Sequence, residues 1–244
     1  MINRTLNITH VIPVYAPAWQ FGGPVLSVSR LCEALAKRGH HVKVLTTNAG
    51  LPEINCNNFG LEVDRHGVQV FYFPVDQQHG AIQSRELEES LTDCLKGSDL
   101  LHISTIWQPL GIPVQKEAYR LKIPVIQSLR GALGPYSRAR GWWKKIPYYY
   151  FQERPWLQRA ASLHVPTHQE QKELEKLGLQ APCHLLANPI DLEHLSFNEE
   201  EGVQWRQRYG IPKEEPILLI CGRQHHKKGL DLLPSVFKRL VQLP

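Results

Sequence analysis

The chain has 244 residues and a mass of 28.0 kDa, enough for one full domain and the beginning of another. Its hydrophobic content of 42% and charged content of 21% are typical of globular proteins, so the composition excludes a disordered chain and a fibre. The net charge of +5 is compatible with phosphorylated substrates, an anionic membrane surface or weak contact with nucleic acid, and charge alone does not choose among them.

Short β-rich runs alternate with longer helical patterns along most of the chain. This alternation is typical of a parallel sheet covered by helices on both faces. We therefore predict an α/β fold with a doubly wound, Rossmann-like sheet of six or seven parallel strands. The expected strands are Asn7–Val14, His41–Thr46, Val68–Phe73, Leu100–Ile103, Val125–Ser128, Ser162–Val165 and Cys183–Leu186.

Two helices have clear start and stop signals. The first follows Pro24, continues with apolar residues at helical spacing, and meets a stop at Gly39. The second begins at Thr167, whose hydroxyl can bond the amide of Glu170 while the Glu170 carboxylate bonds back, and Gly178 ends it. The apolar face of the first helix is expected to pack on the sheet.

A turn cluster at Ala187–Asp191 marks the expected domain boundary. Residues 1–191 are expected to form the first domain, and residues 192–244 a linker with the incomplete start of a second. In this second part the sequence predicts a helix around Val203–Tyr209, a strand at Ile217–Cys221 and a helix from Leu230 to Leu243. Pro234 is acceptable only in the first turn of that last helix.

A pair of glycines, Gly22 and Gly23, directly precedes the first helix. Glycines at this place let an anion or a sugar approach the backbone N–H groups at the positive end of a helix. An ordinary strand-to-helix turn is the alternative. The G-x-G-x-x-G spacing of a nicotinamide dinucleotide site is absent, which disfavours that cofactor.

Two cationic residues follow the last expected strand. Arg223 follows Ile217–Cys221, and Lys228 precedes the next expected helix. Side chains at the carboxyl end of such a strand, beside a helix start, can bind a diphosphate. Solvated surface charge is the alternative interpretation.

The stretch Arg138–Phe151 is basic and densely aromatic, with Trp142 and Trp143 at its centre. It could grip a lipid-linked or polysaccharide acceptor, or lie on an anionic membrane surface. It could equally form a helix whose aromatic face packs on the sheet. Nucleic-acid binding is disfavoured because no RNA-binding motif accompanies the aromatic residues.

The five cysteines are odd in number and widely spaced, which predicts reduced thiols rather than a disulfide framework. Neither mixed Cys/His spacing nor an H-E-x-x-H motif occurs, so no metal site is expected. The N-terminus has no signal-peptide pattern, and no run reaches the ~18 apolar residues that span a bilayer. We therefore expect a cytoplasmic protein, with any membrane contact peripheral and at the inner face.

Several short motifs follow one another in a recognisable order. They are Phe21-Gly-Gly-Pro24, Leu35-Ala-Lys-Arg-Gly39-His, Asp99-Leu-Leu-His102, Ser128-Leu-Arg-Gly131, Ala187-Asn-Pro-Ile-Asp191, Cys221-Gly-Arg223 and Lys228-Gly-Leu230. Together they resemble the retaining GT-B glycosyltransferases of the large family-four type. Each motif is weak alone, but the series covers essentially the whole chain.

The resemblance implies that residues 1–191 are the acceptor-side lobe and residues 192–244 the start of the donor-side lobe. It also implies that Gly22 and Gly23 approach the donor phosphate. Arg130 stands where many members have a histidine, so its implied role is contact with the acceptor or a phosphate.

The resemblance further implies that Arg223 and Lys228 neutralise the departing diphosphate without a metal or other cofactor. The implied function is retaining, hexosyltransferase-type transfer from a nucleotide diphosphate sugar to a glycan or lipid-linked acceptor, as in polysaccharide biosynthesis. The carboxylate pair that holds the donor sugar in this family would lie beyond residue 244.

The alternative is a truncated, non-catalytic protein that binds an acceptor or a partner. After Asp191 the sequence predicts one strand and about two helices, too little for a second sheet with its own core. The chain alone is therefore expected to have little activity.

Overall fold

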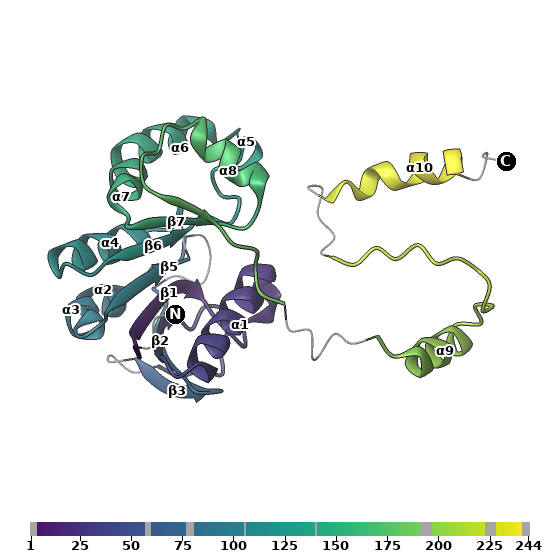
Figure 1. The fold of residues 1–244 in the computed structure, drawn as a ribbon, viewed down its shortest axis with the longest axis horizontal. Coiled ribbons are helices and arrows are strands. Elements are labelled where there is room, and N and C mark those ends of the chain that lie inside the picture. Colours follow the sequence, from purple (N-terminus) through teal and green to yellow (C-terminus); the bar gives the residue numbers. More distant parts are fainter. Residues whose placement is uncertain are drawn as a thin grey trace. The chain divides into compact units, whose positions relative to one another are not determined.

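The computed structural model describes residues 4–56, 60–76, 81–104, 106–139, 141–190, 197–222 and 228–240. The chain divides into two compact units, unit 1 at Met1–Asp191 and unit 2 at Leu192–Pro244. Unit 1 contains a sheet with helices on both faces (Figure 1). The identification of the units as an acceptor lobe and the start of a donor lobe stays a prediction.

The sheet of unit 1 has eight strands in the order β3-β4-β2-β1-β5-β6-β7-β8. From the central β1 the chain builds outward through β2 and β4, then crosses over and builds the other half from β5 to β8. All neighbouring pairs are parallel except β3 with β4. The prediction of a doubly wound α/β sheet is therefore confirmed. The bounds are β1 Asn7–Val14, β2 His41–Thr47, β3 Leu61–Arg65, β4 Val68–Phe73, β5 Leu100–Ile103, β6 Val125–Ser128, β7 Ser162–Val165 and β8 Cys183–Leu185.

Strand β3 was not predicted from the sequence, and it corrects the expectation of an all-parallel sheet. It pairs antiparallel with β4 through a two-residue turn, His66-Gly67, whose φ angles are 54° and 81°. Positive φ at both central residues is the requirement of the type I′ hairpin turn. The strand is short and half-exposed at the sheet edge, so its hydrophobic pattern is weak.

Helices cover the two faces of the sheet. Figure 1 shows α1 on one side of the sheet and α2, α3 and α4 on the other. Residues of α7 and α8, Leu157 and Leu174, pack together in one cluster with Leu163 of β7. On the α1 face, Val28 packs in one cluster with Val44. On the opposite face, Leu95 and Val114 pack with Leu101. The bounds are α1 Gly23–Lys37, α2 Arg85–Glu89, α3 Leu91–Leu95, α4 Gly111–Arg120, α5 Pro135–Ala139, α6 Trp142–Tyr148, α7 Arg154–Arg159 and α8 His168–Glu175, with a 3-10 turn η1 at Trp19–Phe21 and a π-helical turn η2 at Tyr149–Glu153.

The capping box expected at α8 is half formed. The Thr167 hydroxyl accepts a hydrogen bond from the Glu170 amide at 3.2 Å, as predicted. The Glu170 carboxylate does not return to Thr167 but accepts the amide of Gly131 at 2.5 Å. The prediction of the reciprocal bond was wrong, because the Glu170 carboxylate turns instead to the Gly131 amide, which is distant in the sequence.

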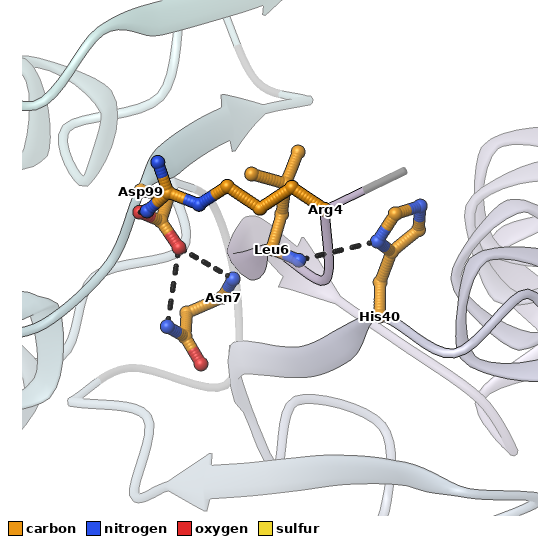
Figure 2. Close-up of polar contacts among 5 residues, drawn as sticks. All are labelled: Arg4, Leu6, Asn7, His40 and Asp99. Atoms are coloured by element: carbon orange, nitrogen blue, oxygen red, sulfur yellow. Dashed lines mark hydrogen bonds and ion pairs between the residues drawn. The ribbon is translucent and has the colours of Figure 1, made fainter. Parts of the chain in front are cut away.

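A small polar cluster fixes the amino-terminal edge of the sheet (Figure 2). Asp99, just before β5, accepts the Asn7 amide at 2.8 Å and pairs with Arg4 at 2.8 Å. The hydrogen bond from Asn7 and the nearby Arg4 lower the pKa of Asp99. His40, just before β2, accepts the Leu6 amide through Nδ1 at 3.3 Å. The starts of β1, β2 and β5 are thus tied together, which aligns their carboxyl ends.

Unit 2 contains helix α9 (Glu199–Arg208), a 3-10 turn η4 (Leu230–Leu232) and helix α10 (Leu233–Leu240). Pro234 lies in the first turn of α10, as required. The strand expected at Ile217–Cys221 is wrong: the described residues of this unit form no strand. A strand needs a neighbour to pair its backbone groups, and none is present in the described part of unit 2.

The apolar side chains of residues 217–220 are consequently exposed rather than packed. The last expected helix begins with a 3-10 turn, and its final residues, 241–243, lie outside the described part of the chain. No described helix of either unit is long and apolar enough to cross a membrane.

Candidate functional site

A cavity of about 240 Å³ opens at the carboxyl ends of the central strands of unit 1. Its position between β1 and β5 is the point at which the strand order reverses. Open α/β sheets bind ligands at this switch point, because the connections diverge there and leave a crevice. The lining residues are Ile12, Pro13, Val14, Phe21, Pro24, Val25, Ser104, Ile106, Gln108, Ser128, Leu129, Arg130 and Ala132.

The predicted glycine pair lies at the edge of this cavity. Gly22 caps α1 with φ 84° and ψ −148°, a conformation that only glycine adopts easily. Gly23 is the first residue of α1, and a Cβ placed on it would meet nothing within 4 Å. Both neighbours of the pair, Phe21 and Pro24, line the cavity. The start of α1 is therefore open to an approaching group, as the sequence indicated.

Arg130 joins three segments that are far apart in the sequence. Its Nη1 donates to the Ser27 hydroxyl on α1 at 2.7 Å and to the Asn188 side-chain oxygen at 2.8 Å. Among the described residues, its Nε and Nη2 are buried without a hydrogen-bond partner. Burial lowers the pKa of the guanidinium, and the nearby Glu170 carboxylate opposes that shift. Arg130 is therefore a cation at the cavity wall whose Nε and Nη2 donors form no hydrogen bond with the described residues.

The backbone that presents Arg130 is held in an unusual conformation. Arg130 has φ 50° and Gly131 has φ 72°, so two successive residues are left-handed. This is costly for a residue with a side chain, by roughly 1–2 kcal/mol. The buried carboxylate of Glu170 accepts the Gly131 amide and thereby fixes the turn. Glu170 therefore supports the site. The sequence did not indicate this role, because the capping-box pattern assigned the Glu170 carboxylate to the start of its own helix.

A chain of buried polar groups runs beneath the cavity from β1 to β7. His10 lies 3.0 Å from the Ser104 hydroxyl, and its ring contacts the His102 ring at a tilt of 41°, with the centroids 4.3 Å apart. The Ser128 hydroxyl lies 2.6 Å from His102 Nε2 and 2.6 Å from His164 Nδ1. His164 Nε2 continues the chain, 2.7 Å from the backbone oxygen of residue 186. Ser128 is therefore the link between two histidines.

All three histidines are neutral at pH 7. Burial, followed by the charges of His102 and Arg130, lowers the pKa of His10 well below its usual value. Burial and then His164 lower the pKa of His102 to about 3. Burial also lowers the pKa of His164. A protonated imidazole at any of these places would be buried near another cation, so the chain stabilises the neutral forms.

The sequence did not predict this polar chain. In the sequence, His102 stands in a family motif, and no metal-ligand spacing connects it with His10 or His164. The signal that could have found them is register: His10 pairs with His102 across β1 and β5, and Ser128 pairs with His164 across β6 and β7. Polar residues at matching depth in otherwise apolar parallel strands indicate a shared buried layer.

The loop after β5 is held by a second buried carboxylate. Glu153 ends η2 and accepts the backbone amide of Trp107 at 2.9 Å. Trp107 has φ 65°, and its indole N–H donates to the Ala132 carbonyl at 2.8 Å. Burial raises the pKa of Glu153 to about 7. Because Ile106 and Gln108 line the cavity on either side of Trp107, Glu153 fixes one wall of the site.

The cations predicted from the end of the chain belong to unit 2. Lys228 is exposed, and a Cβ placed on Gly222 would lie 4.0 Å from its Cε. Arg223 lies outside the described residues. The diphosphate-binding role expected for Arg223 and Lys228 therefore stays a prediction. In unit 1 the structure does bring together the other candidates, Gly22, Gly23 and Arg130.

A larger hollow of about 440 Å³ lies at the opposite, amino-terminal edge of the sheet. Lys43, Lys96 and His41 are among its lining residues. The Lys43 ammonium already donates to the backbone carbonyl of Cys94 at 2.9 Å. We regard the smaller cavity as the functional site, because the switch point, the helix start and the Arg130 guanidinium meet only there among the described cavities.

The described residues contain no group of three or more His, Cys, Asp or Glu side chains that could hold a metal ion. The cysteines in the described residues are free thiols. The expectation of a metal-independent reaction stays a prediction.

The fold and the position of the site define the class: unit 1 is a Rossmann-like α/β domain of the kind found in GT-B glycosyltransferases. Residues 22–189 match the glycosyl transferase 4-like domain family. Because this match covers well over half of the chain, the protein belongs to that family. No curated protein sequence matches the chain significantly.

Solved structures agree on the fold. The chain is similar to Anabaena HepE in complex with UDP-glucose, at 15% identity and a TM-score of 0.56, covering 84% of this chain and 50% of that one. It is also similar to a trehalose-6-phosphate structure from E. coli bound with UDP-2-fluoro glucose, at 12% identity and a TM-score of 0.50, covering 83% and 54%. The chain thus spans about half the length of these neighbours.

Proposed function

We propose that the protein takes part in transfer of a glycosyl unit from a nucleotide diphosphate sugar to a hydroxyl of a glycan or lipid-linked acceptor. The bond between the anomeric carbon and the diphosphate oxygen breaks, and a bond from that carbon to the acceptor oxygen forms. The acceptor proton and the nucleoside diphosphate are released. Family membership supports the reaction class, and the UDP-sugars bound by HepE and the E. coli protein support the donor class.

The observation that carries the proposal is the Arg130 guanidinium at the cavity wall, next to the start of α1. A departing diphosphate or an anionic acceptor group in the cavity would meet both the cation and the open end of the helix. Negative charge grows on the diphosphate in the transition state, so donors fixed in advance lower the barrier by about 3 kcal/mol each. Arg130 and the Gly23 amide would be such donors, because Pro24 has no N–H and the Val25 and Leu26 amides already donate to the Gly22 carbonyl.

The remaining roles rest on the family resemblance. Gly22 and Gly23 would allow the donor phosphate to approach the backbone. Arg223 and Lys228 would neutralise the diphosphate from the donor side, without a metal. Retention of the anomeric configuration belongs to the same proposal.

A binding experiment tests the site without requiring turnover. We expect Arg130→Met to weaken binding of UDP, GDP or ADP, measured by calorimetry, about tenfold, since a charged hydrogen bond contributes roughly 1.5 kcal/mol. Arg85→Met is the matched control, because Arg85 is exposed on α2 and away from the cavity lining. Equal affinities for the wild type and Arg130→Met would contradict a phosphate role for Arg130.

Turnover tests the donor-side pair. In an enzyme preparation with acceptor-dependent release of nucleoside diphosphate, Arg223→Ala and Lys228→Ala should each reduce the rate about 10²-fold, or roughly 3 kcal/mol. Near-normal rates in both variants would refute the assignment.

A non-catalytic role is the second candidate, and the lack of any strand among the described residues of unit 2 favours it. In that case the 244-residue chain binds an acceptor or a partner and releases no nucleoside diphosphate from a panel of nucleotide sugars. We expect little turnover by this chain alone, because the described residues of unit 2 form no sheet that could orient the donor, and orientation supplies much of the rate. Robust, acceptor-dependent turnover would exclude the non-catalytic role.

A further inference from the structure

One segment of unit 1, residues 136–151, carries six exposed large apolar side chains among its described residues. It is formed by α5, α6 and η2; α5 and α6 lie together at one end of unit 1 (Figure 1), and η2 contacts α6. Trp142 and Trp143 are 61% and 63% exposed, and Phe151 is 78% exposed. We call this the aromatic surface and define it by Tyr136, Trp142, Trp143, Ile146, Tyr150 and Phe151, all of which are exposed.

The aromatic surface is not the packed face of a helix. The same segment does have packed residues, since Tyr149 and Leu157 are buried in a cluster with Leu129 and Leu163. These residues anchor the segment to the sheet and leave the tryptophans in solvent. Aromatic side chains bury about 150–250 Å² each when covered, so two adjacent exposed tryptophans are a large unused apolar area.

The charge of the segment has a single sign. From Gly131 to Gln152 the sequence has four cationic residues and no carboxylate. Lys144 is exposed, and its Nζ lies 4.7 Å from the centroid of the Trp143 ring. Cations with long stems beside tryptophans are the composition of surfaces that lie at the boundary between lipid head groups and acyl chains.

We propose that the aromatic surface docks unit 1 onto an anionic lipid bilayer. The tryptophans would sit at the level of the head groups, while Ile146 and Phe151, which have no polar end, would enter the acyl boundary. Lys144 and its neighbouring cations would contact the lipid phosphates. A polysaccharide or a single-stranded nucleic acid would stack on the tryptophans but would leave Ile146 and Phe151 with less favourable partners.

The aromatic surface is also connected to the cavity. Lys145 Nζ lies 5.3 Å from the centroid of the Trp107 ring, and the Trp107 indole donates to the Ala132 carbonyl. Ala132 and Ile106, next to Trp107, line the cavity. A docked unit 1 would therefore hold its cavity near the membrane surface, which favours lipid-linked acceptors. That last step rests on the proposed function, whereas docking itself does not.

Flotation of the purified chain with vesicles tests docking. The test compares neutral phosphatidylcholine vesicles with vesicles that contain about 30% phosphatidylglycerol, each at low and high salt. The wild type should float with the anionic vesicles at low salt and not with the neutral ones, since screening weakens the charge contacts. Trp142→Ser with Trp143→Ser should weaken binding about tenfold or more. Lys144→Ser should weaken it about fivefold.

Trp205→Ser is the matched control, because Trp205 is an exposed tryptophan on α9 of unit 2. It should leave flotation unchanged. Urea unfolding of every variant is the folding control, and we expect unchanged midpoints because the substituted positions are exposed.

Three results would overturn the docking proposal. The first is that the wild type does not float with the anionic vesicles. The second is that the double tryptophan variant floats with them as well as the wild type does. The third is that the tryptophans are needed for binding a soluble polysaccharide or oligonucleotide, while no vesicles are bound. Flotation needs no nucleotide sugar. A failure of nucleoside diphosphate binding together with normal flotation would therefore count against the proposed function alone.

Discussion

Replacing Ser128 by alanine removes the hydroxyl that links His102 to His164 in the buried polar chain. The hydroxyl lies 2.6 Å from a ring nitrogen of each histidine, and the Ser128 side chain is 1% exposed. The substitution therefore removes two hydrogen bonds and leaves only a small void. It does not change the backbone or the charge of the site.

The expected cost follows from the two nitrogen atoms left behind. A buried donor or acceptor without a partner costs about 1–3 kcal/mol. Both histidines are neutral at pH 7, because burial depresses their pKa values, so the bonds are not charge-assisted and the low half of that range applies. Two such groups give about 3 kcal/mol, a large part of the ~5–15 kcal/mol stability of a domain.

The measurement is urea unfolding at pH 7.5 followed by circular dichroism, with the slope m compared between proteins. Ser98→Ala is the control. The Ser98 hydroxyl also contacts a hydroxyl, that of Thr9 at 2.7 Å, but Ser98 is only half-buried and water can replace the bond. Its cost should stay below about 1 kcal/mol. Equal losses in Ser128→Ala and Ser98→Ala would refute the reasoning that the buried chain supports unit 1.

Three further changes have definite expectations. In urea unfolding, Glu153→Gln should be as stable as the wild type near pH 4.5 and more stable by about 3 kcal/mol at pH 8. The reason is that the folded pKa of Glu153 is about 7, above its unfolded value, so the wild type loses stability as the buried carboxyl ionises with rising pH, whereas Gln does not ionise. A pH-independent difference would contradict this. Gly60→Ala should cost about 1 kcal/mol more than Gly97→Ala: both have φ near 80°, but only at Gly60 would the Cβ lie 3.2 Å from the buried Phe73 ring. His66→Asn should preserve or raise the melting temperature, since Asn suits positive φ in a type I′ turn; a marked loss would show that His66 has another role.

The sequence predicted the strands of unit 1 closely because their signals are local. Seven of the expected runs form strands with the same or nearly the same bounds, and Gly39 and Gly178 follow the ends of α1 and α8 with positive φ. The central strands β1, β5, β6 and β7 are mostly buried on both faces, so they read as continuous apolar runs that turn residues interrupt. Their alternation with helices was enough to predict a doubly wound sheet.

Part of the candidate site could be located from the sequence for a similar reason, although the roles of its residues stay predictions. Gly22 and Gly23 were found because a glycine pair before a helix is a local pattern. Arg130 was found through a family motif, but its partners Ser27 and Asn188 lie on other segments, so no local pattern could connect them. The role of Glu170 was hidden because its partner, the Gly131 amide, becomes available only when β6 and α8 come together.

By itself, therefore, the sequence determined the α/β class, the places of seven strands in unit 1 and the family, because periodicity, turn residues and ordered motifs are properties of the chain. Only the tertiary structure decided that Ser128 joins two histidines, that Trp142 and Trp143 stay exposed, and that residues 217–221 do not form a strand. Each of these depends on which groups lie opposite one another after folding. A hydrogen bond, a buried ring and a strand all need a partner, and the sequence pattern of one segment does not contain its partner.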